Sequence, residues 1–331
     1  MRVLYAFQGT GNGHHTRAME FLPLLDRMAD VDVWVSGGPM DRAYDVDVDR
    51  RMPGAGFAFG TRGGIHWGKT LKQARPAQLF RDVRTADLRG YDGVLCDFEP
   101  ISAWAARRQG VPVVSLSHQA AVQHPASPKP ARKAPLSTGI LRHYAPASHQ
   151  IGFHFQRYAL DIRTPVIRRA VREVPVGNRG HVTVYLPSFG QAQILQVLRR
   201  LPQVEWQVFS RHWAEASEHD NVRLFPASAE GFLQSMAASA GVLCGAGFET
   251  AAEALFLGKP LLVIPQQGQY EQACNAHCLA DMGVATLSRF GPDAAPALAR
   301  WLADSQVIEV AYPDESAEVL EHALALLAQS P

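Results

Sequence analysis

A short apolar strand, a glycine-containing turn and a helix follow one another twice along this sequence, once in each half. In the first half, Arg2–Phe7 is the apolar run, Gly9–Gly13 is the turn, and Thr16–Met28 has apolar residues at helical spacing. In the second half, Val182–Leu186 and the turn Pro187–Gly190 repeat this order before another helical run. The restart predicts two α/β domains, which suits a chain of 331 residues.

Further strand-like runs alternate with helical ones in both halves, which predicts parallel sheets covered by helices. These runs are Val31–Val35, Gly93–Cys96, Val111–Ser115, Val204–Phe209, Val222–Phe225, Gly241–Cys244 and Leu261–Ile264. We expect an N-terminal domain over residues 1–165 and a C-terminal domain over 166–331, with a connecting helix at Ile162–Val171. The proline-rich stretch Gln119–Pro146 shows no periodicity and predicts a long functional loop, whereas Asp314–Ala328 predicts an amphipathic helix.

Charge and composition exclude several classes of protein. Lys and Arg total 32 against 31 Asp and Glu, which argues against a dedicated nucleic-acid-binding protein with its basic excess. No apolar run approaches the roughly 20 residues that cross a bilayer, and no signal-peptide pattern precedes the first strand. The 4 cysteines do not make a disulfide framework in a chain of this length. We therefore expect a soluble, cytoplasmic protein.

The first glycine turn does not match the known nucleotide-binding fingerprints. Its glycines lack the spacing of the dinucleotide motif, and the second strand ends without the acidic residue that binds a ribose. No Gly-Lys-Ser/Thr follows, which excludes a P-loop. What remains is a flexible turn, Gly11, Asn12 and Gly13, that places His14 at the carboxyl end of a strand, where α/β sheets hold ligands. From position alone, a surface histidine is an equally good interpretation.

The glycine turn of residues 245–247 gives a sharper signal. It lies between an apolar strand and an alanine-rich helix, whose unpaired N–H groups and dipole suit a diphosphate. Glu249 and Glu253 lie one turn apart on the same face of that helix. A carboxylate at Glu253 is well suited to accept two hydrogen bonds from ribose hydroxyls. The alternative is that both residues are ordinary solvated acids.

A polar stretch after the next strand completes a resemblance to a known family. Residues 245–276 read G-x-G-F-x-T-x-x-E-A-L, then L-G-K-P-L-L-V-I-P, then E-Q-x-x-N-A. This order resembles the donor-binding half of inverting GT-B glycosyltransferases, closest to the MurG-like and UDP-glycosyltransferase group, and the opening G-T-G-N-G-H resembles their Gly-His turn. The resemblance implies an α/β fold of the GT-B type. In it, two Rossmann-like parallel-sheet domains face each other across a cleft, and the C-terminal helix packs back on the N-terminal domain.

The resemblance also implies a role for each residue of the donor-side motifs. Glu253 would hold the nucleotide ribose, and Glu271 and Gln272 would read the transferred sugar ahead of a supporting helix that begins at Asn275. The diphosphate and its surroundings would be bound by two turns and the helix start after the second, made of Ser188, Phe189, Gly245, Ala246, Gly247, Phe248 and Thr250. The nucleotide sugar is a substrate, so no cofactor is implied, and the favoured nucleotide is UDP. The plant enzymes carry a Trp and a His before the glycine turn, and Leu243 and Cys244 replace them here.

On the acceptor side, the resemblance implies that the turn Gly11, Asn12 and Gly13 faces the acceptor and that His14 is the base. Asp97, which ends a strand, is its expected partner, and Asp97 and Glu99 are the next candidates for the base itself. An inverting transfer is a single displacement at the anomeric carbon, so a base must deprotonate the acceptor hydroxyl. Helix N-termini would neutralise the leaving diphosphate without a metal ion.

Two metal-like patterns are set aside. The segment Asp45–Asp49 contains the D-x-D of the other glycosyltransferase architecture, but it lies among arginines and away from any glycine turn, which favours an exposed edge strand or loop. Cys274, His277 and Cys278 share a helix without four ligands at zinc spacing, which favours buried thiols.

The acceptor is less constrained by the sequence. Arg62–Lys69 and Lys129–Lys133 carry basic residues that would suit a lipid-linked or cell-envelope glycan acceptor at the inner face of the membrane, or are solvated loops. Two other functions stay open. One is a nucleotide-sugar 2-epimerase of the same fold, and the other is a non-catalytic subunit that binds a sugar nucleotide, a partner or a lipid.

Overall fold

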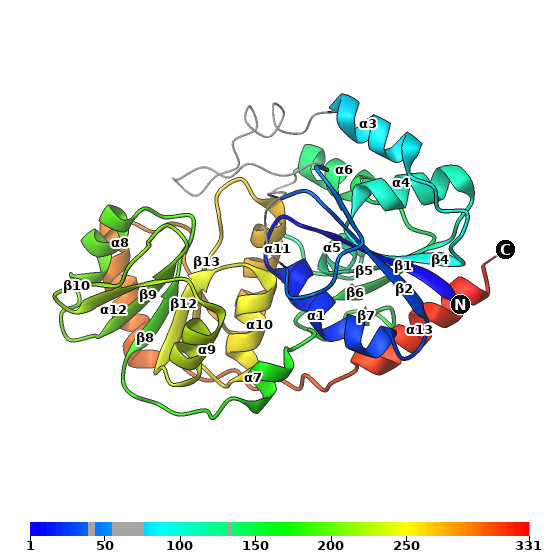
Figure 1. The fold of residues 1–331 in the computed structure, drawn as a ribbon. Coiled ribbons are helices and arrows are strands. Elements are labelled where there is room, and N and C mark those ends of the chain that lie inside the picture. The colour runs from blue at the N-terminus through cyan, green and yellow to red at the C-terminus, as the bar shows by residue number, and fades with distance from the viewer. Residues whose placement is uncertain (39–43, 55–75, 132–133, 331) are drawn as a thin grey trace.

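The computed structural model describes residues 1–38, 44–54, 76–131 and 134–330, which form two seven-stranded sheets lying side by side (Figure 1). In the first sheet the strand order is β3-β2-β1-β4-β5-β6-β7, and every pair is parallel. Its strands are β1 (Arg2–Gln8), β2 (Asp30–Ser36), β3 (Arg50–Met52), β4 (Gly93–Asp97), β5 (Val113–Ser117), β6 (His149–Phe153) and β7 (Ile162–Arg163).

The second sheet has the order β10-β11-β9-β8-β12-β13-β14 and is parallel except for the β10–β11 pair at its edge. Its strands are β8 (Val182–Tyr185), β9 (Trp206–Ser210), β10 (Ser217–His219), β11 (Val222–Pro226), β12 (Gly241–Gly245), β13 (Leu261–Ile264) and β14 (Ala285–Thr286). This confirms the expected GT-B arrangement of two parallel-sheet units, each covered by helices.

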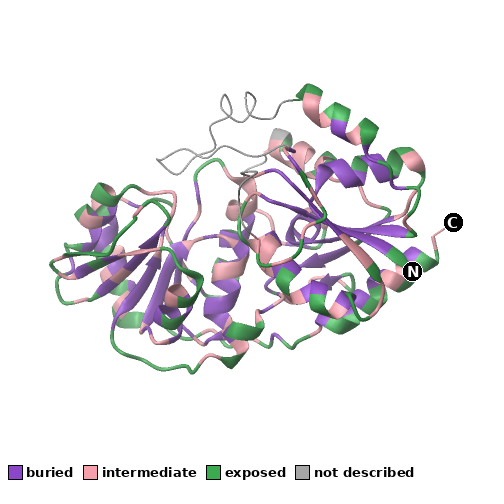
Figure 2. Ribbon diagram, viewed as in Figure 1, coloured by how far each residue is buried: buried purple, intermediate pink, exposed green. Residues whose placement is uncertain are grey.

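The helices lie on the faces of the two sheets, and the strands between them are buried (Figure 2). Those of the first unit are α1 (Gly13–Leu25), α3 (Pro76–Thr85), α4 (Pro100–Gln109), α5 (His118–Gln123) and α6 (Pro135–Tyr144), and α7 (Arg169–Glu173) lies in the connection. Those that follow are α8 (Gln191–Leu198), α9 (Ala229–Ala237), α10 (Phe248–Phe256), α11 (Tyr270–Asp281), α12 (Ala295–Asp304) and α13 (Ser316–Ala328).

Side chains alternate along β1 between two cores, as the period of a strand requires. Tyr5 and Phe7 pack with α1 and α13 on one face, whereas Leu4 and Ala6 pack with α4 on the other. All four side chains are fully buried. The two faces explain why the opening run is apolar throughout, because a central parallel strand is covered on both sides.

The C-terminal helix α13 returns to the first unit, where it lies beside α1 (Figure 1). Its apolar stripe, which includes Leu320 and Leu327, is buried in the core under the first sheet. Gly93 makes room for this contact, because a Cβ there would lie 2.6 Å from a methyl group of Leu327. The expectation that this helix packs back on the N-terminal unit is therefore confirmed.

Two expectations about local structure are wrong. Residues Ile162–Arg163 form strand β7, and the helix of the connection begins only at Arg169. Pro165 explains the difference, because the residue before a proline disfavours the helical region. The stretch Gln119–Pro146 is also not one long loop, since it contains most of α5 and all of α6.

No helix in the described part of the chain is both long and apolar enough to span a bilayer.

Candidate functional site

The carboxyl ends of β1 and β4 lie side by side, with Phe7 opposite Asp97 in the register. The turn after β1 leads into α1, and its first turn places His14 over the end of β4. Nδ1 of His14 lies 2.8 Å from Oδ1 of Asp97, and both side chains are buried. An ionised Asp97 fixes the proton on Nδ1 and leaves Nε2 as the basic nitrogen.

Arg17, one turn after His14 on α1, holds the same carboxylate from the other side. Its Nε donates to Oδ2 of Asp97 at 2.9 Å, and a terminal nitrogen lies 3.2 Å from Oδ1. Burial by itself would raise the pKa of Asp97, but the charges of Arg17 and His14 outweigh burial and lower that pKa. Asp97 therefore stays ionised inside the protein.

Opposing effects set the pKa of His14. Burial works to lower this pKa, and the Arg17 charge acts in the same direction. The charge and hydrogen bond of Asp97 and the charge of Glu249 raise it, and the net result is a raised pKa. His14 is therefore a stronger base than a free imidazole, and it carries a proton at mildly acid pH.

Glu99 does not join this pair. Its carboxylate caps α4, accepting from the backbone N–H groups of Ile101 at 2.8 Å and Ser102 at 2.7 Å, and Ser36 also donates to it. The side chain is fully buried, and burial raises its pKa. These contacts give Glu99 a structural role at the N-terminus of α4, where an acidic cap is favourable.

Phe98, between Asp97 and Glu99, has a left-handed backbone with φ of 56°. For a residue other than glycine, this conformation costs about 1–3 kcal/mol and is concentrated at functional sites. The Phe98 ring stacks on Tyr144 at a centroid distance of 4.7 Å and lies parallel to the His14 ring at 6.4 Å. Phe98 therefore forms an aromatic wall beside the His14–Asp97 pair.

The turn before α1 lies against the second half of the chain. Gly11 has a φ of 93°, Asn12 is the N-cap residue of α1, and Gly13 begins the helix. A Cβ at Gly13 would collide with the carboxylate of Glu249, in the first turn of α10. A terminal nitrogen of Arg17 lies 3.3 Å from Oε1 of Glu249. The β1–turn–α1 segment and the β12–turn–α10 segment therefore meet at this point.

The second glycine turn presents backbone rather than side chains. Gly247 is the N-cap residue of α10, and no side chain among the described residues caps that helix. A Cβ added at Gly247 would meet no atom of the described residues within 4 Å, so none of them fills the space in front of the turn. Phe248 and Thr250 lie in the first turn of the helix, and the N–H groups there suit an anion.

Glu253, on α10, is buried against the connection between the two units rather than lying at an open surface. Its side chain is buried and forms a two-pronged ion pair with Arg168 of the connection, with distances of 2.5 and 2.7 Å. Burial raises the pKa of Glu253, and the Arg168 charge opposes that rise. Each carboxylate oxygen keeps a further lone pair, because an ionised carboxylate has about four acceptor positions.

The two residues expected to read the sugar lie at the start of α11. Oε1 of Gln272 accepts from the backbone N–H of Gln266 at 2.8 Å and lies 3.8 Å from where a Cβ of Gly245 would be. Oε2 of Glu271 accepts from Gln119 of α5 at 3.0 Å. The structure therefore brings Gln272 to the glycine turn and Glu271 to the first unit.

Ser188 and Phe189 lie in the turn after β8. Since β8 pairs in parallel with β12, their turn lies at the same sheet edge as Gly245. The Phe189 ring packs on Phe290 at 5.2 Å.

The motifs did not single out His118, which links the two units through buried hydrogen bonds. Nδ1 lies 2.7 Å from the carbonyl oxygen of Phe153, and Nε2 lies 2.8 Å from Oδ1 of Asn275. Asn275 in turn donates to the carbonyl of Ala246 at 3.0 Å, and the His118 ring stacks on Phe248 at 3.9 Å. A histidine of the first unit therefore supports the glycine turn of the second.

The patterns set aside as metal sites have structural contacts. Asp49 accepts from the backbone N–H of Val33 at 2.7 Å, and Cys274 and Cys278 are buried free thiols. Across the described ranges, no group of three or more metal-ligating side chains lies close enough to hold an ion.

The basic stretches expected on the acceptor side are only partly described. Lys129 donates to the carbonyl oxygens of His124 at 2.6 Å and Ser127 at 3.1 Å. Arg62–Lys69, Arg132 and Lys133 lie outside the described residues.

Comparison with known proteins gives consistent results. Residues 1–294 match the family described as glycosyl transferase family 1, and no protein of curated function matches significantly in sequence. Among solved structures, the glycotransferase of kitacinnamycin has a TM-score of 0.61 at 15% identity, covering 99% of this chain and 96% of its own.

Two further structures are similar over almost their whole length. The spinosyn rhamnosyltransferase SpnG, complexed with thymidine diphosphate, has a TM-score of 0.56 at 17% identity, covering 100% of this chain and 96% of its own. UGT89C1 from Arabidopsis thaliana, complexed with quercetin, has a TM-score of 0.57 at 13% identity, covering 99% and 95%. At these identities the likeness establishes the fold.

Proposed function

The chain belongs to glycosyl transferase family 1 and is a glycosyltransferase of GT-B architecture, and we propose that it moves a sugar from a nucleoside diphosphate donor to an acceptor hydroxyl with inversion. One observation carries this proposal. Gly13, the neighbour of His14, lies against Glu249 in the first turn of α10. The candidate base and the candidate diphosphate site therefore lie at one junction between the two units.

The first step assigned to the protein is proton transfer. In neutral His14, the Nδ1–H group donates a hydrogen bond to Asp97, and Nε2 accepts the proton of the acceptor hydroxyl. As that proton leaves, the acceptor oxygen bonds to the anomeric carbon and the bond from that carbon to the diphosphate oxygen breaks. The ionised Asp97 stabilises the resulting imidazolium, and Arg17 keeps Asp97 ionised.

The second unit supports the leaving group. We assign the diphosphate to the space before Gly247, where the N–H groups and dipole of α10 stabilise the charge that grows on it. This electrostatic role needs no metal ion. Glu253, oriented by Arg168, would accept from the ribose hydroxyls, and Gln272 would contact the sugar.

A donor screen tests the proposal. UDP- and dTDP-sugars come first, because the structure of SpnG contains thymidine diphosphate and another similar structure is complexed with UDP-2-fluoro-glucose. A bound donor raises the melting temperature by mass action. The stabilising donor is then incubated with candidate acceptors in EDTA, and NMR of the product gives its anomeric configuration.

We expect inverted product and full turnover in EDTA. A retained configuration, or activity that EDTA abolishes, would contradict the proposal. Conversion of the donor alone into a second nucleotide sugar would favour the 2-epimerase instead.

A further inference from the structure

A polar patch interrupts one face of the first sheet, between α4 and α6. Parallel sheets are usually apolar on both faces because helices cover both. On β5, Val113 packs in the core with α4, but Ser115 and Ser117, the next residues on that face, are buried serines with their Oγ atoms 3.1 Å apart. On the neighbouring strand β6, Gln150 is exposed.

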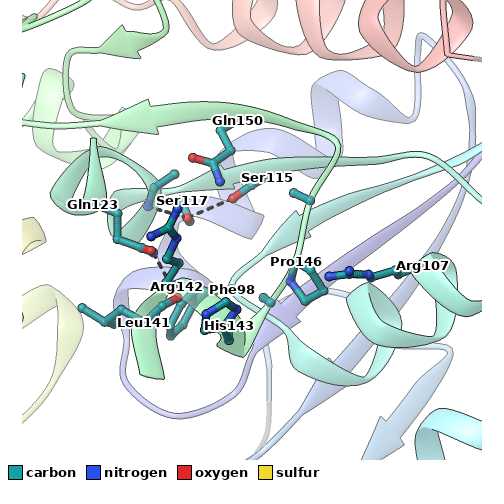
Figure 3. A pocket seen from close by; sticks show the side chains of 13 residues that line it. Phe98, Arg107, Ser115, Ser117, Gln123, Leu141, Arg142, His143, Pro146 and Gln150 are labelled. Carbon is teal, nitrogen blue, oxygen red and sulfur yellow. Dashed lines mark hydrogen bonds between the residues drawn. The ribbon is translucent and has the colours of Figure 1, made fainter. Parts of the chain in front are cut away.

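These residues line a cavity of about 200 Å³, shown in Figure 3. Arg142 and His143, from the end of α6, line the cavity together with Arg107 of α4. None of the described lining residues is acidic, so the cavity is positively charged. A second hollow, of about 420 Å³, shares Arg107, Pro146 and Ala147 with the first, so the two hollows are neighbours.

The cavity lies next to the candidate base. Phe98 lines it, and the same ring lies parallel to His14 at 6.4 Å. Phe98 follows Asp97 directly along the chain, so one residue belongs both to the cavity lining and to the surroundings of the candidate base. A molecule bound in the cavity would therefore lie one aromatic ring away from His14.

Building on the proposed function, we infer that this cavity binds the acceptor and selects a hydroxylated molecule that carries a phosphate or carboxylate group. Serine hydroxyls and the Gln150 amide both donate and accept, which suits sugar hydroxyls. The arginines suit an oxyanion, because charge-assisted hydrogen bonds are about twice as strong as neutral ones. Such an acceptor differs from quercetin, the uncharged polyphenol in the UGT89C1 complex.

Calorimetric titration without donor tests this inference, with glucose 1-phosphate, glucuronate and methyl glucoside as probes. We expect the two charged probes to bind at least about tenfold more tightly than methyl glucoside, since a charged hydrogen bond contributes more than a neutral one. Whichever charged probe binds more tightly identifies the acidic group as phosphate or carboxylate. Equal binding of all three probes, or binding of none, would overturn the inference.

Variants locate the binding. Arg142→Ala should weaken binding of the charged probe with the higher affinity about tenfold. Ser115→Val, which keeps a strand-forming residue, should weaken the same binding about fivefold. Arg300→Ala is the matched control, because Arg300 is exposed on α12 outside this cavity. Unchanged binding in both Arg142→Ala and Ser115→Val, with melting temperatures equal to wild type, would contradict the cavity assignment.

A measurement of slow donor hydrolysis by water distinguishes a failure of this inference from a failure of the proposed function. Intact donor hydrolysis with no binding of the charged probes would refute the acceptor class alone. Tight binding of a charged probe by a protein that neither binds nor hydrolyses any nucleotide sugar would refute the proposed function and leave the cavity as an anion site.

Discussion

The β1–turn–α1 segment of the first unit and the β12–turn–α10 segment of the second have the same topology but present different chemistry. The turn after β1 delivers charged side chains, because α1 places His14 and Arg17 on Asp97. The turn after β12 delivers backbone, because Gly247 caps α10 without a side chain and faces space that none of the described residues fills. The difference teaches that one architecture can supply a base from one copy and an anion site from the other. Substitutions should therefore separate turnover from donor affinity.

The largest effect is expected in the first unit. His14→Ala should lower kcat by about 10²–10⁴-fold, the usual contribution of a positioned base, with donor affinity unchanged. Steady-state kinetics with the donor from the screen measures the loss. His15→Ala is the control, since His15 instead accepts from the backbone of Asp45. Near-full turnover of the His14 variant would refute the assignment of the base.

In the second unit, Gly247→Val should block the donor while leaving the fold intact. Gly247 has a φ of −69°, which valine adopts, and its Cβ would meet none of the described residues within 4 Å. We expect donor affinity to fall by about tenfold or more, through overlap with the ligand. Gly291→Val is the matched control, because a Cβ there likewise meets no described residue within 4 Å. Equal donor affinity in both variants would argue against this turn as the diphosphate site.

His118 belongs to the first unit, but its substitution should also affect donor binding by the second unit. His118→Phe keeps the ring against Phe248 but removes the imidazole nitrogens that contact the Phe153 carbonyl and Oδ1 of Asn275. An unpaired buried polar group costs about 1–3 kcal/mol, so urea unfolding should show a loss of that order. Donor KM should also rise, although the residue belongs to the first unit. An unchanged KM would show that the glycine turn keeps its shape without His118.

The smallest effect is a shift in pH dependence. Activity needs neutral His14, so kcat/KM falls as pH drops through the pKa of His14. Arg17 acts to lower that pKa, and therefore Arg17→Gln should move the acid limb of the profile to higher pH. A limb that moves to lower pH, or does not move, would show that His14 is not the titrating base.

The resemblance of the motifs predicts His14 and Asp97 as partners, although they lie on different strand–helix segments. Asp97 ends β4 and His14 lies in the first turn of α1, and the parallel pairing of β1 with β4 brings the two side chains together. The glycine turn of β12 and α10 lies within one strand–turn–helix segment, so the local pattern was sufficient to predict it.

Contacts between distant segments were not visible in the sequence. Arg168 and Glu253 are 85 positions apart, and His118 and Asn275 are 157 apart, so their pairing depends on how the two units pack. The motifs predict a ribose partner for the carboxylate of Glu253, but no local pattern indicates that Arg168 holds it. The sequence pattern predicts that the strand before His118 ends at Ser115, whereas it extends to Ser117. The pattern therefore does not indicate that His118 directly follows the end of a strand.

We propose above that backbone N–H groups at the start of α10 bind the donor diphosphate. An amide NMR titration of the isotopically labelled protein with UDP in EDTA observes these groups themselves. We expect the largest shifts at the amides of Gly247, Phe248 and Glu249, with saturation unaffected by added magnesium. Shifts confined to the first unit, or binding that appears only after magnesium is added, would contradict it.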